Sequence, residues 1–177
     1  MKVLQSVLAL VLLGFPIGSA RADEIFGGVL AHDVGSPFTR GGFERGADLQ
    51  LGWRGDRIGA LRVIGSPSPY VFGSLSTAGD TNFAAAGLSW RIGGRLYVRP
   101  GIGIAVHDRD SLIIGENGLR RDLGSRILFE PEIGFGYQLN DTLSIEASLV
   151  HLSQAQLFSR QNPGMDSIGL RLNHRFR

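Results

Sequence analysis

The sequence contains no cysteine, so no disulfide can stabilise its fold and no thiolate can serve as a nucleophile. Lysine occurs only at position 2, and all other basic residues are arginine. Arginine suits bidentate contacts with phosphate or carboxylate, although GC-rich coding would produce the same bias. Beyond the first 22 residues, no apolar run approaches the roughly 20 residues that a membrane helix needs. A chain of this kind can therefore enter a membrane integrally only as a β-barrel.

The first 22 residues have the pattern of a secretory signal peptide. Lys2 supplies the positive start, residues 7–15 form the apolar centre, and Ala-Arg-Ala at 20–22 is a small-x-small cleavage site. Loss of Lys2 and Arg21 reduces the 18 basic residues to 16, which equals the number of acidic residues. The exported chain is therefore formally neutral, and we expect no nucleic-acid partner. We predict a signal peptide at residues 1–22 and one domain at residues 23–177.

Short segments in which apolar and polar residues alternate recur along the exported chain, as in a protein built of β-strands. We predict strands at residues 24–33, 43–53, 58–64, 81–92, 95–107, 127–139, 143–153 and 165–176. The Ser-, Pro- and Gly-rich residues 65–80 are predicted to form a loop. With this assignment long and short connections alternate strictly, which is typical of outer-membrane barrels with long external loops and short periplasmic turns.

The two faces of these predicted strands differ sharply in composition. One face stays apolar for six or seven positions in residues 95–107 and 127–139. The opposite face carries glycines together with charged residues, namely Arg99, Glu130, Glu132, Glu146 and Arg171. A soluble sandwich or lipocalin would turn the apolar face inward, whereas an outer-membrane barrel turns it toward lipid and packs paired charges inside. The unbroken apolar faces, the composition of the polar faces and the loop pattern favour the second.

We therefore predict an all-β fold, an eight-stranded antiparallel transmembrane outer-membrane β-barrel. Two prolines in the predicted strands, Pro100 and Pro131, conflict with a closed barrel because proline cannot donate a ladder hydrogen bond. We expect each of them to lie at a β-bulge.

A histidine, a serine and an aspartate fall on the apolar faces of the last two predicted strands, at the ends that one loop joins. His151 and Ser153 continue the face of Ile145, and Asp166 shares the face of Ile168. Because neighbouring strands bring opposed side chains to about 5 Å, Ser153 can act as a nucleophile, His151 as its base and Asp166 as the orienting carboxylate. Each residue alone has an ordinary reading as an interfacial or turn residue. Their coincidence on one face favours catalysis.

These residues also carry a family resemblance. The pattern H-x-S, then an N-P-G turn, an acid and a last strand ending in R-F, resembles the C-terminal signature of the PagL family of lipid A 3-O-deacylases. The resemblance covers residues 149–176 in motif and the exported chain in architecture. It implies an outer-membrane enzyme that hydrolyses the ester at position 3 of lipid A, with His151 as base, Ser153 as nucleophile and Asp166 as the acid.

The chain departs from the family pattern at two positions, Asp166 and Gln154. Asp166 stands where the best-known members have glutamate, which shortens the reach to His151. Gln154 stands where the family usually has an asparagine whose amide helps to hold the oxyanion, and a misplaced oxyanion donor can cost about 10²–10³ in rate. Asn162 matches a loop asparagine near the family's site.

The resemblance implies lipopolysaccharide (lipid A) in the outer leaflet and outer-membrane lipid as partners, an outer-membrane location and no cofactor, and it leaves a homodimer open. The four histidines show no metal-ligand spacing, so we expect no metal. Two other functions stay open. One is a non-catalytic small outer-membrane barrel with a structural or adhesive role, and the other, less favoured, is a secreted soluble barrel that binds a lipid inside.

Overall fold

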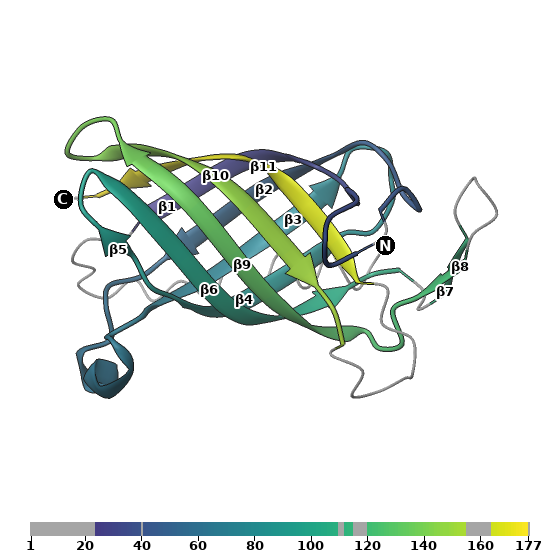
Figure 1. The fold of residues 1–177 in the computed structure, drawn as a ribbon, viewed down its shortest axis with the longest axis horizontal. Coiled ribbons are helices and arrows are strands. Elements are labelled where there is room, and N and C mark those ends of the chain that lie inside the picture. Colours follow the sequence, from purple (N-terminus) through teal and green to yellow (C-terminus); the bar gives the residue numbers. More distant parts are fainter. Residues whose placement is uncertain (1–23, 40, 110–111, 115–119, 155–163, 177) are drawn as a thin grey trace.

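The computed structural model describes residues 24–39, 41–109, 112–114, 120–154 and 164–176, so the signal peptide predicted at 1–22 lies outside the described residues. Within these ranges, eight long antiparallel strands form a closed barrel (Figure 1). They are β1 (Glu24–Ala31), β2 (Ala47–Arg54), β3 (Ser68–Ser76), β4 (Phe83–Ser89), β6 (Leu96–His107), β9 (Ile127–Gln138), β10 (Leu143–Leu152) and β11 (Met165–Arg175). Each pairs with its neighbour along the chain, and β1 pairs with β11 to close the barrel. The predicted fold class is confirmed.

Smaller elements accompany these eight strands. They are a 3-10 helix, η1 (Gly59–Ile64), a two-residue strand, β5 (Ile92–Gly93), and a hairpin of β7 (Leu112–Ile114) and β8 (Arg120–Asp122) that projects from one end (Figure 1). Within the part of the chain that the structure describes, no helix is both long and apolar enough to cross a membrane. The hairpin lies at the end of the barrel with the connections 32–46, 77–82, 108–126 and 153–164, which we call the loop end. The other end, with residues 55–67, 90–95 and 139–142, we call the turn end.

The third strand was assigned wrongly from the sequence. Within the predicted strand 58–64, residues 59–64 form η1 instead, and their apolar side chains Val63 and Ile64 are exposed. The third strand is β3, which lies in the segment 65–80 that was predicted to be a loop. Proline, serine and glycine obscured its alternation, although Tyr70 and Phe72 both point inward and are buried. As a consequence, connection 55–67 is longer than connection 77–82, and the strict alternation of loop lengths is wrong at this point.

The outer wall of the barrel is apolar, as predicted. Its exposed residues include Ile25, Val29, Leu49, Leu51, Leu75, Ile102, Ile104, Phe135, Ile168, Leu170 and Leu172. The charged residues of the opposite faces are buried in the lumen instead. Glycine makes room for them: a side chain at Gly134 would place its Cβ 2.8 Å from Cγ of Glu146.

Three buried arginines pair with three of the buried glutamates in the lumen. Arg99 donates from Nε to Glu146 at 2.9 Å, and Arg171 donates from Nη1 to Glu132 at 2.6 Å. The third pair is Arg54 with Glu24. Buried charges are tolerated where they are paired in this way. A lumen filled with ion pairs contradicts the soluble barrel that would bind a lipid inside.

The two prolines do not lie at bulges, which corrects the expectation from the sequence. The register between β6 and β9 is constant across both of them. Pro100 lies opposite Trp90, just beyond the end of β4. Pro100 has no N–H to donate to Trp90, but Trp90 N still donates to Pro100 O. Pro131 faces β10, where the ladder stops at Val150 and resumes only at the bridge between Ser153 and Phe129. The gap in the β9–β10 ladder therefore falls opposite His151.

Candidate active site

His151 and Asp166 lie directly opposite each other on β10 and β11, at the loop end of the barrel. Nδ1 of His151 is 2.5 Å from Oδ1 of Asp166. The carboxylate is fully buried, whereas 18% of the histidine side chain is exposed. Because an ionised carboxylate can only accept a hydrogen bond, the imidazole carries its proton on Nδ1 and Nε2 is left as the basic atom.

Ser153 lies two residues beyond His151 on the same strand path. Its backbone makes two hydrogen bonds with Phe129, of 3.0 Å and 2.7 Å, which extend the β9–β10 pairing past Pro131. Residues two apart on a strand face the same side with Cα atoms about 6–7 Å apart. Ser153 is buried, and no hydrogen bond between it and His151 is present among the described residues. The structure thus places His151 and Asp166 in hydrogen-bond contact, and Ser153 lies two residues from His151 without a hydrogen bond to it among the described residues.

The first connection at the loop end, residues 32–46, closes over this pair. Ser36 donates from Oγ to the second oxygen of Asp166, and Val34 N donates to the Asp166 carbonyl at 2.8 Å. The ring of Phe38 meets that of His151 edge-on, with 6.2 Å between their centroids. Sequence reasoning missed these residues, because a contact between positions 36 and 166 leaves no periodic signal.

The backbone at Gly164, the last residue of the N-P-G motif, requires glycine. Its φ is +58°, a backbone conformation that residues other than glycine rarely adopt. A Cβ there would lie 2.9 Å from Cε1 of His151 and 2.6 Å from Cγ2 of Thr39. Because glycine has no Cβ, His151 and Thr39 of the first connection can pack closely against the backbone at position 164.

Of the two predicted supporting residues, only Gln154 is described, and it is buried. Its amide lies against Gly124, where a Cβ would come within 2.6 Å of Nε2. The amide is thus held against the segment that leads into β9. Asn162 lies outside the described residues.

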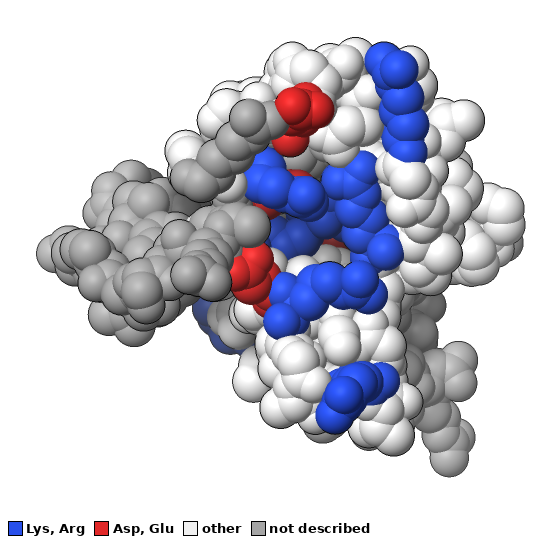
Figure 2. Space-filling view, turned by 90° about the vertical axis from the view of Figure 1, so that its left-hand side faces the viewer, with Lys and Arg blue, Asp and Glu red and all other residues white. Residues whose placement is uncertain are grey.

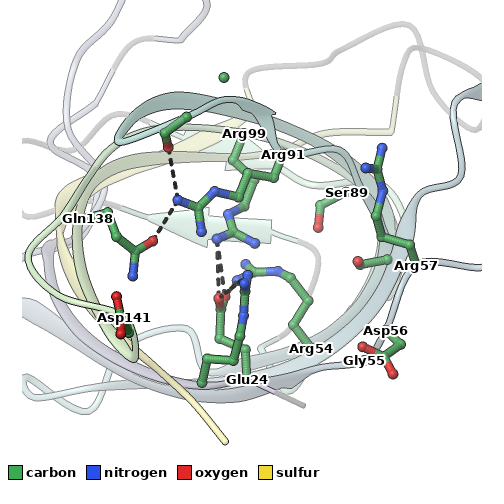
Figure 3. A pocket seen from close by; sticks show the side chains of 14 residues that line it. Glu24, Arg54, Gly55, Asp56, Arg57, Ser89, Arg91, Arg99, Gln138 and Asp141 are labelled. Carbon is green, nitrogen blue, oxygen red and sulfur yellow. Dashed lines mark hydrogen bonds and ion pairs between the residues drawn. The ribbon is translucent and has the colours of Figure 1, made fainter. Parts of the chain in front are cut away.

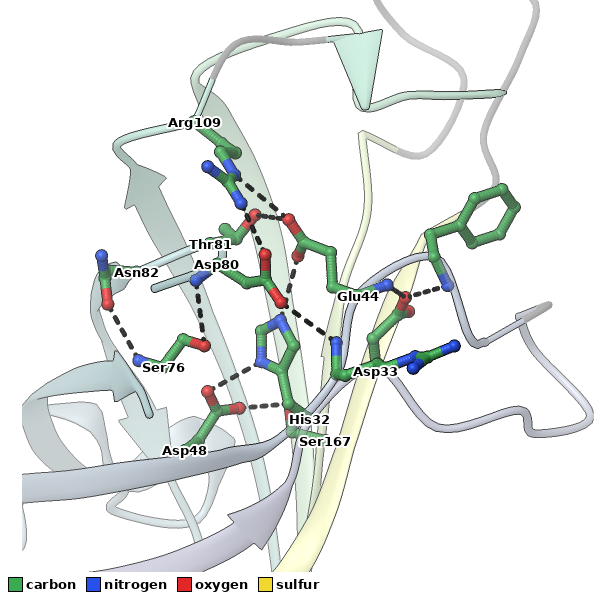
Figure 4. A network of polar contacts seen from close by, with 12 residues as sticks. His32, Asp33, Glu44, Asp48, Ser76, Asp80, Thr81, Asn82, Arg109 and Ser167 are labelled. Carbon is green, nitrogen blue, oxygen red and sulfur yellow. Dashed lines mark hydrogen bonds and ion pairs between the residues drawn. The ribbon is translucent and has the colours of Figure 1, made fainter. Parts of the chain in front are cut away.

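A buried network beneath the same loops fixes the start of β11 (Figure 4). His32 contacts Asp48 Oδ1 from Nδ1 at 2.8 Å and Glu44 Oε2 from Nε2 at 2.9 Å. Ser167, the residue after Asp166, donates to the other oxygen of Asp48 at 2.7 Å. Burial alone would lower the pKa of His32, but the hydrogen bonds and charges of the two carboxylates outweigh it and raise the pKa to about 9.

We expect this network to weaken in alkaline solution. The folded-state pKa of His32 lies above its unfolded value of about 6.5. Its stabilisation is therefore complete below pH 6.5 and is lost as the pH rises through about 9. Thermal unfolding of the wild type and of His32→Gln from pH 6 to 10 measures it: the advantage of the wild type should shrink toward pH 10. A constant difference over that range would contradict a charged His32.

Comparisons with known proteins agree with this architecture. The crystal structure of the outer membrane enzyme PagL is similar with a TM-score of 0.61 and 19% identity, over 85% of this chain and 98% of that chain. The backbone structure of the Yersinia pestis outer membrane protein Ail in a phospholipid bilayer nanodisc gives 0.50 and 12%, over 88% and 99%. At these identities the two likenesses show the fold alone.

The sequence comparisons identify the family. No curated protein matches the chain. The family model of PagL, lipid A 3-O-deacylase, matches residues 41–175, which include all the predicted site residues but not Ser36. None of the comparisons supports the homodimer that the resemblance left open. The chain therefore belongs to the PagL family of lipid A 3-O-deacylases and is an outer-membrane β-barrel of that family.

Proposed function

We propose that this chain is a serine esterase that removes the acyl chain esterified at position 3 of lipid A. The proposal rests above all on the contact between His151 Nδ1 and the buried carboxylate of Asp166 in a member of this family. A histidine held in this way has Nε2 free to accept a proton, which is what activation of a serine hydroxyl requires.

The proposed reaction has two steps. Nε2 of His151 takes the proton of Ser153 Oγ while Oγ attacks the ester carbonyl, and the imidazolium that forms is stabilised by Asp166. The bond to the sugar oxygen breaks, that oxygen receives the proton, and an acyl-serine remains. Water then attacks the acyl group with His151 again as base, and the fatty acid leaves. We assign Gln154, through its backbone N–H and its amide, to the oxyanion.

The position of the site suits a lipid substrate. Outer-membrane barrels carry their longer loops outside, so we place the loop end at the outer leaflet. The exposed apolar residues Ile168 and Leu170 follow Asp166 down the same outer wall. An acyl chain lying along this wall would keep its contact with hydrocarbon while its ester reaches Ser153. Lipid A would thus approach from the side, within the membrane.

Mass spectrometry of lipid A tests the proposal. Cells whose lipid A carries a 3-O-acyl chain are compared with and without the expressed protein, and fragmentation locates the missing chain. We expect loss of one chain at position 3, and no loss with Ser153→Ala. Unchanged lipid A with a folded barrel would favour the non-catalytic outer-membrane barrel, and loss from another position would refute only the 3-O assignment.

Ser36 should matter for the rate. Its hydroxyl is a hydrogen-bond donor to the carboxylate that orients His151. A hydrogen bond to a charged group contributes about 1.5–3 kcal/mol, so Ser36→Ala should lower kcat by roughly 10–100-fold with little change in KM. Ser36→Thr, which keeps a hydroxyl, should restore most of the rate. Equal activity of Ser36→Ala and the wild type in a detergent assay would exclude this role.

A further inference from the structure

The turn end of the barrel opens into an arginine-rich cavity. Figure 2 views this end and shows basic side chains gathered around a hollow. The cavity has a volume of about 540 Å³, and Figure 3 shows its lining side chains. Its charged residues are five arginines (Arg54, Arg57, Arg91, Arg99 and Arg175) against three acids (Glu24, Asp56 and Asp141). The site at His151 lies at the opposite end of β10, so this cavity belongs to a different part of the molecule.

One acid serves three of these arginines. Glu24 is in contact with Arg54, is 3.2 Å from Arg99 and is 3.7 Å from Arg175. The other acid partner of Arg99 lies deeper, at Glu146. Glu24 therefore cannot neutralise the positive charge that surrounds it.

Two further arginines have no acid partner among the described residues. Arg91 donates to the carbonyl of Gly94 at 3.2 Å and to the amide oxygen of Gln138 at 2.6 Å, and it stacks 3.9 Å from the ring centre of Tyr97. Among the described residues, the acceptors for Arg57 are the backbone carbonyls of Gly65 and Ser66. The neutral partners fix both guanidinium groups at the cavity without cancelling their charge.

Arg54 supplies a second, independent observation. Only 2% of this residue is exposed, and it lines the cavity. Its Nε and Nη2 make no hydrogen bond within the described part of the chain, and Nη2 is 3.8 Å from a carboxylate oxygen of Glu132. Buried guanidinium donors that lack an acceptor are costly, so a ligand that accepts from them is favoured.

We propose that this cavity binds a phosphate group. Guanidinium groups recognise phosphate by paired hydrogen bonds, and arginines from several walls suit its tetrahedral oxygens. Because the turns of outer-membrane barrels face the periplasm, the phosphate is either inorganic phosphate of that compartment or the headgroup of an inner-leaflet lipid. Exposed apolar residues at this rim, Ile92 and Leu96, place the cavity mouth beside such headgroups. The proposal does not depend on the esterase activity.

Binding of inorganic phosphate to the refolded exported chain in a zwitterionic detergent tests the proposal. Calorimetry at constant ionic strength should give saturable binding to the wild type. Arg91→Gln should weaken it at least tenfold, because it removes one charge that has no acid partner among the residues the structure describes. Arg95→Gln is the matched control: it removes the same charge from the same turn, but Arg95 does not line the cavity, so affinity should stay within twofold.

A competition arm distinguishes the two sources. If short-chain phosphatidylglycerol displaces inorganic phosphate, a lipid headgroup is the ligand; if it does not, free phosphate is. Both results support a phosphate site. Absence of saturable phosphate binding, or an equal loss in Arg91→Gln and Arg95→Gln, would overturn the proposal, since the first leaves no site and the second indicates diffuse charge attraction. A folded barrel, shown by its heat-dependent gel mobility, is required of both variants.

Discussion

Replacing Ser153 with alanine, or His151 with phenylalanine, is expected to lower kcat for lipid A deacylation by about 10³–10⁴-fold, and replacing both should lower it no further. The reason is that the two residues act as one unit: without the base the hydroxyl is a poor nucleophile, and without the hydroxyl the base has no proton to take. A detergent assay that measures released fatty acid against time gives the three rates.

Ser148→Ala is the matched control for this prediction. Ser148 lies on the same strand but is buried in the lumen, where its hydroxyl donates to Glu146 at 3.2 Å. The same chemical change at this position should leave kcat within about twofold, because the site lies on the outer wall at the strand's end. A double variant much slower than either single variant would show that Ser153 and His151 contribute independently, and the proposed mechanism would fail.

The sequence was sufficient for most of the fold because a barrel strand in a membrane has a strict pattern. Lipid on one side and packed charges on the other enforce period 2, and β6, β9, β10 and β11 follow it closely. β3 does not follow it in composition, because Pro69 and Gly73 stand on its lipid-facing side and the aromatic residues Tyr70 and Phe72 on its lumen-facing side. The apolar residues of η1, which are exposed, were therefore mistaken for the third strand.

Only those site residues that lie on or next to strands could be predicted from the sequence. The opposition of His151 and Asp166 followed from two consecutive strands and one loop, and the structure places these two side chains in contact. The contact of Ser36 with Asp166 spans 130 positions and depends on how a loop folds back. The cavity at the turn end was likewise invisible, because its arginines come from strand ends and turns that meet only in the closed barrel.

Arg171→Met is expected to lower the free energy of unfolding by about 3–5 kcal/mol, because it leaves the buried carboxylate of Glu132 without its hydrogen-bonded partner. Arg171 is buried, donates to Glu132 at 2.6 Å and to Gln50 at 2.9 Å, and its guanidinium lies 5.0 Å from the ring centre of Phe72. Methionine would keep the apolar contact but supply neither donor. Urea unfolding from lipid vesicles, followed by tryptophan fluorescence, measures the change.

Two further variants decide whether the buried charge is the cause. Arg175→Met makes the same replacement at a side chain that is 42% exposed and 3.7 Å from Glu24, so it should cost no more than about 1 kcal/mol. Adding Glu132→Gln to Arg171→Met removes the stranded charge and should recover part of the loss. If Arg171→Met costs no more than Arg175→Met, or if the second change brings no recovery, then water and not ion pairing stabilises the lumen, and the buried network does not hold the barrel together.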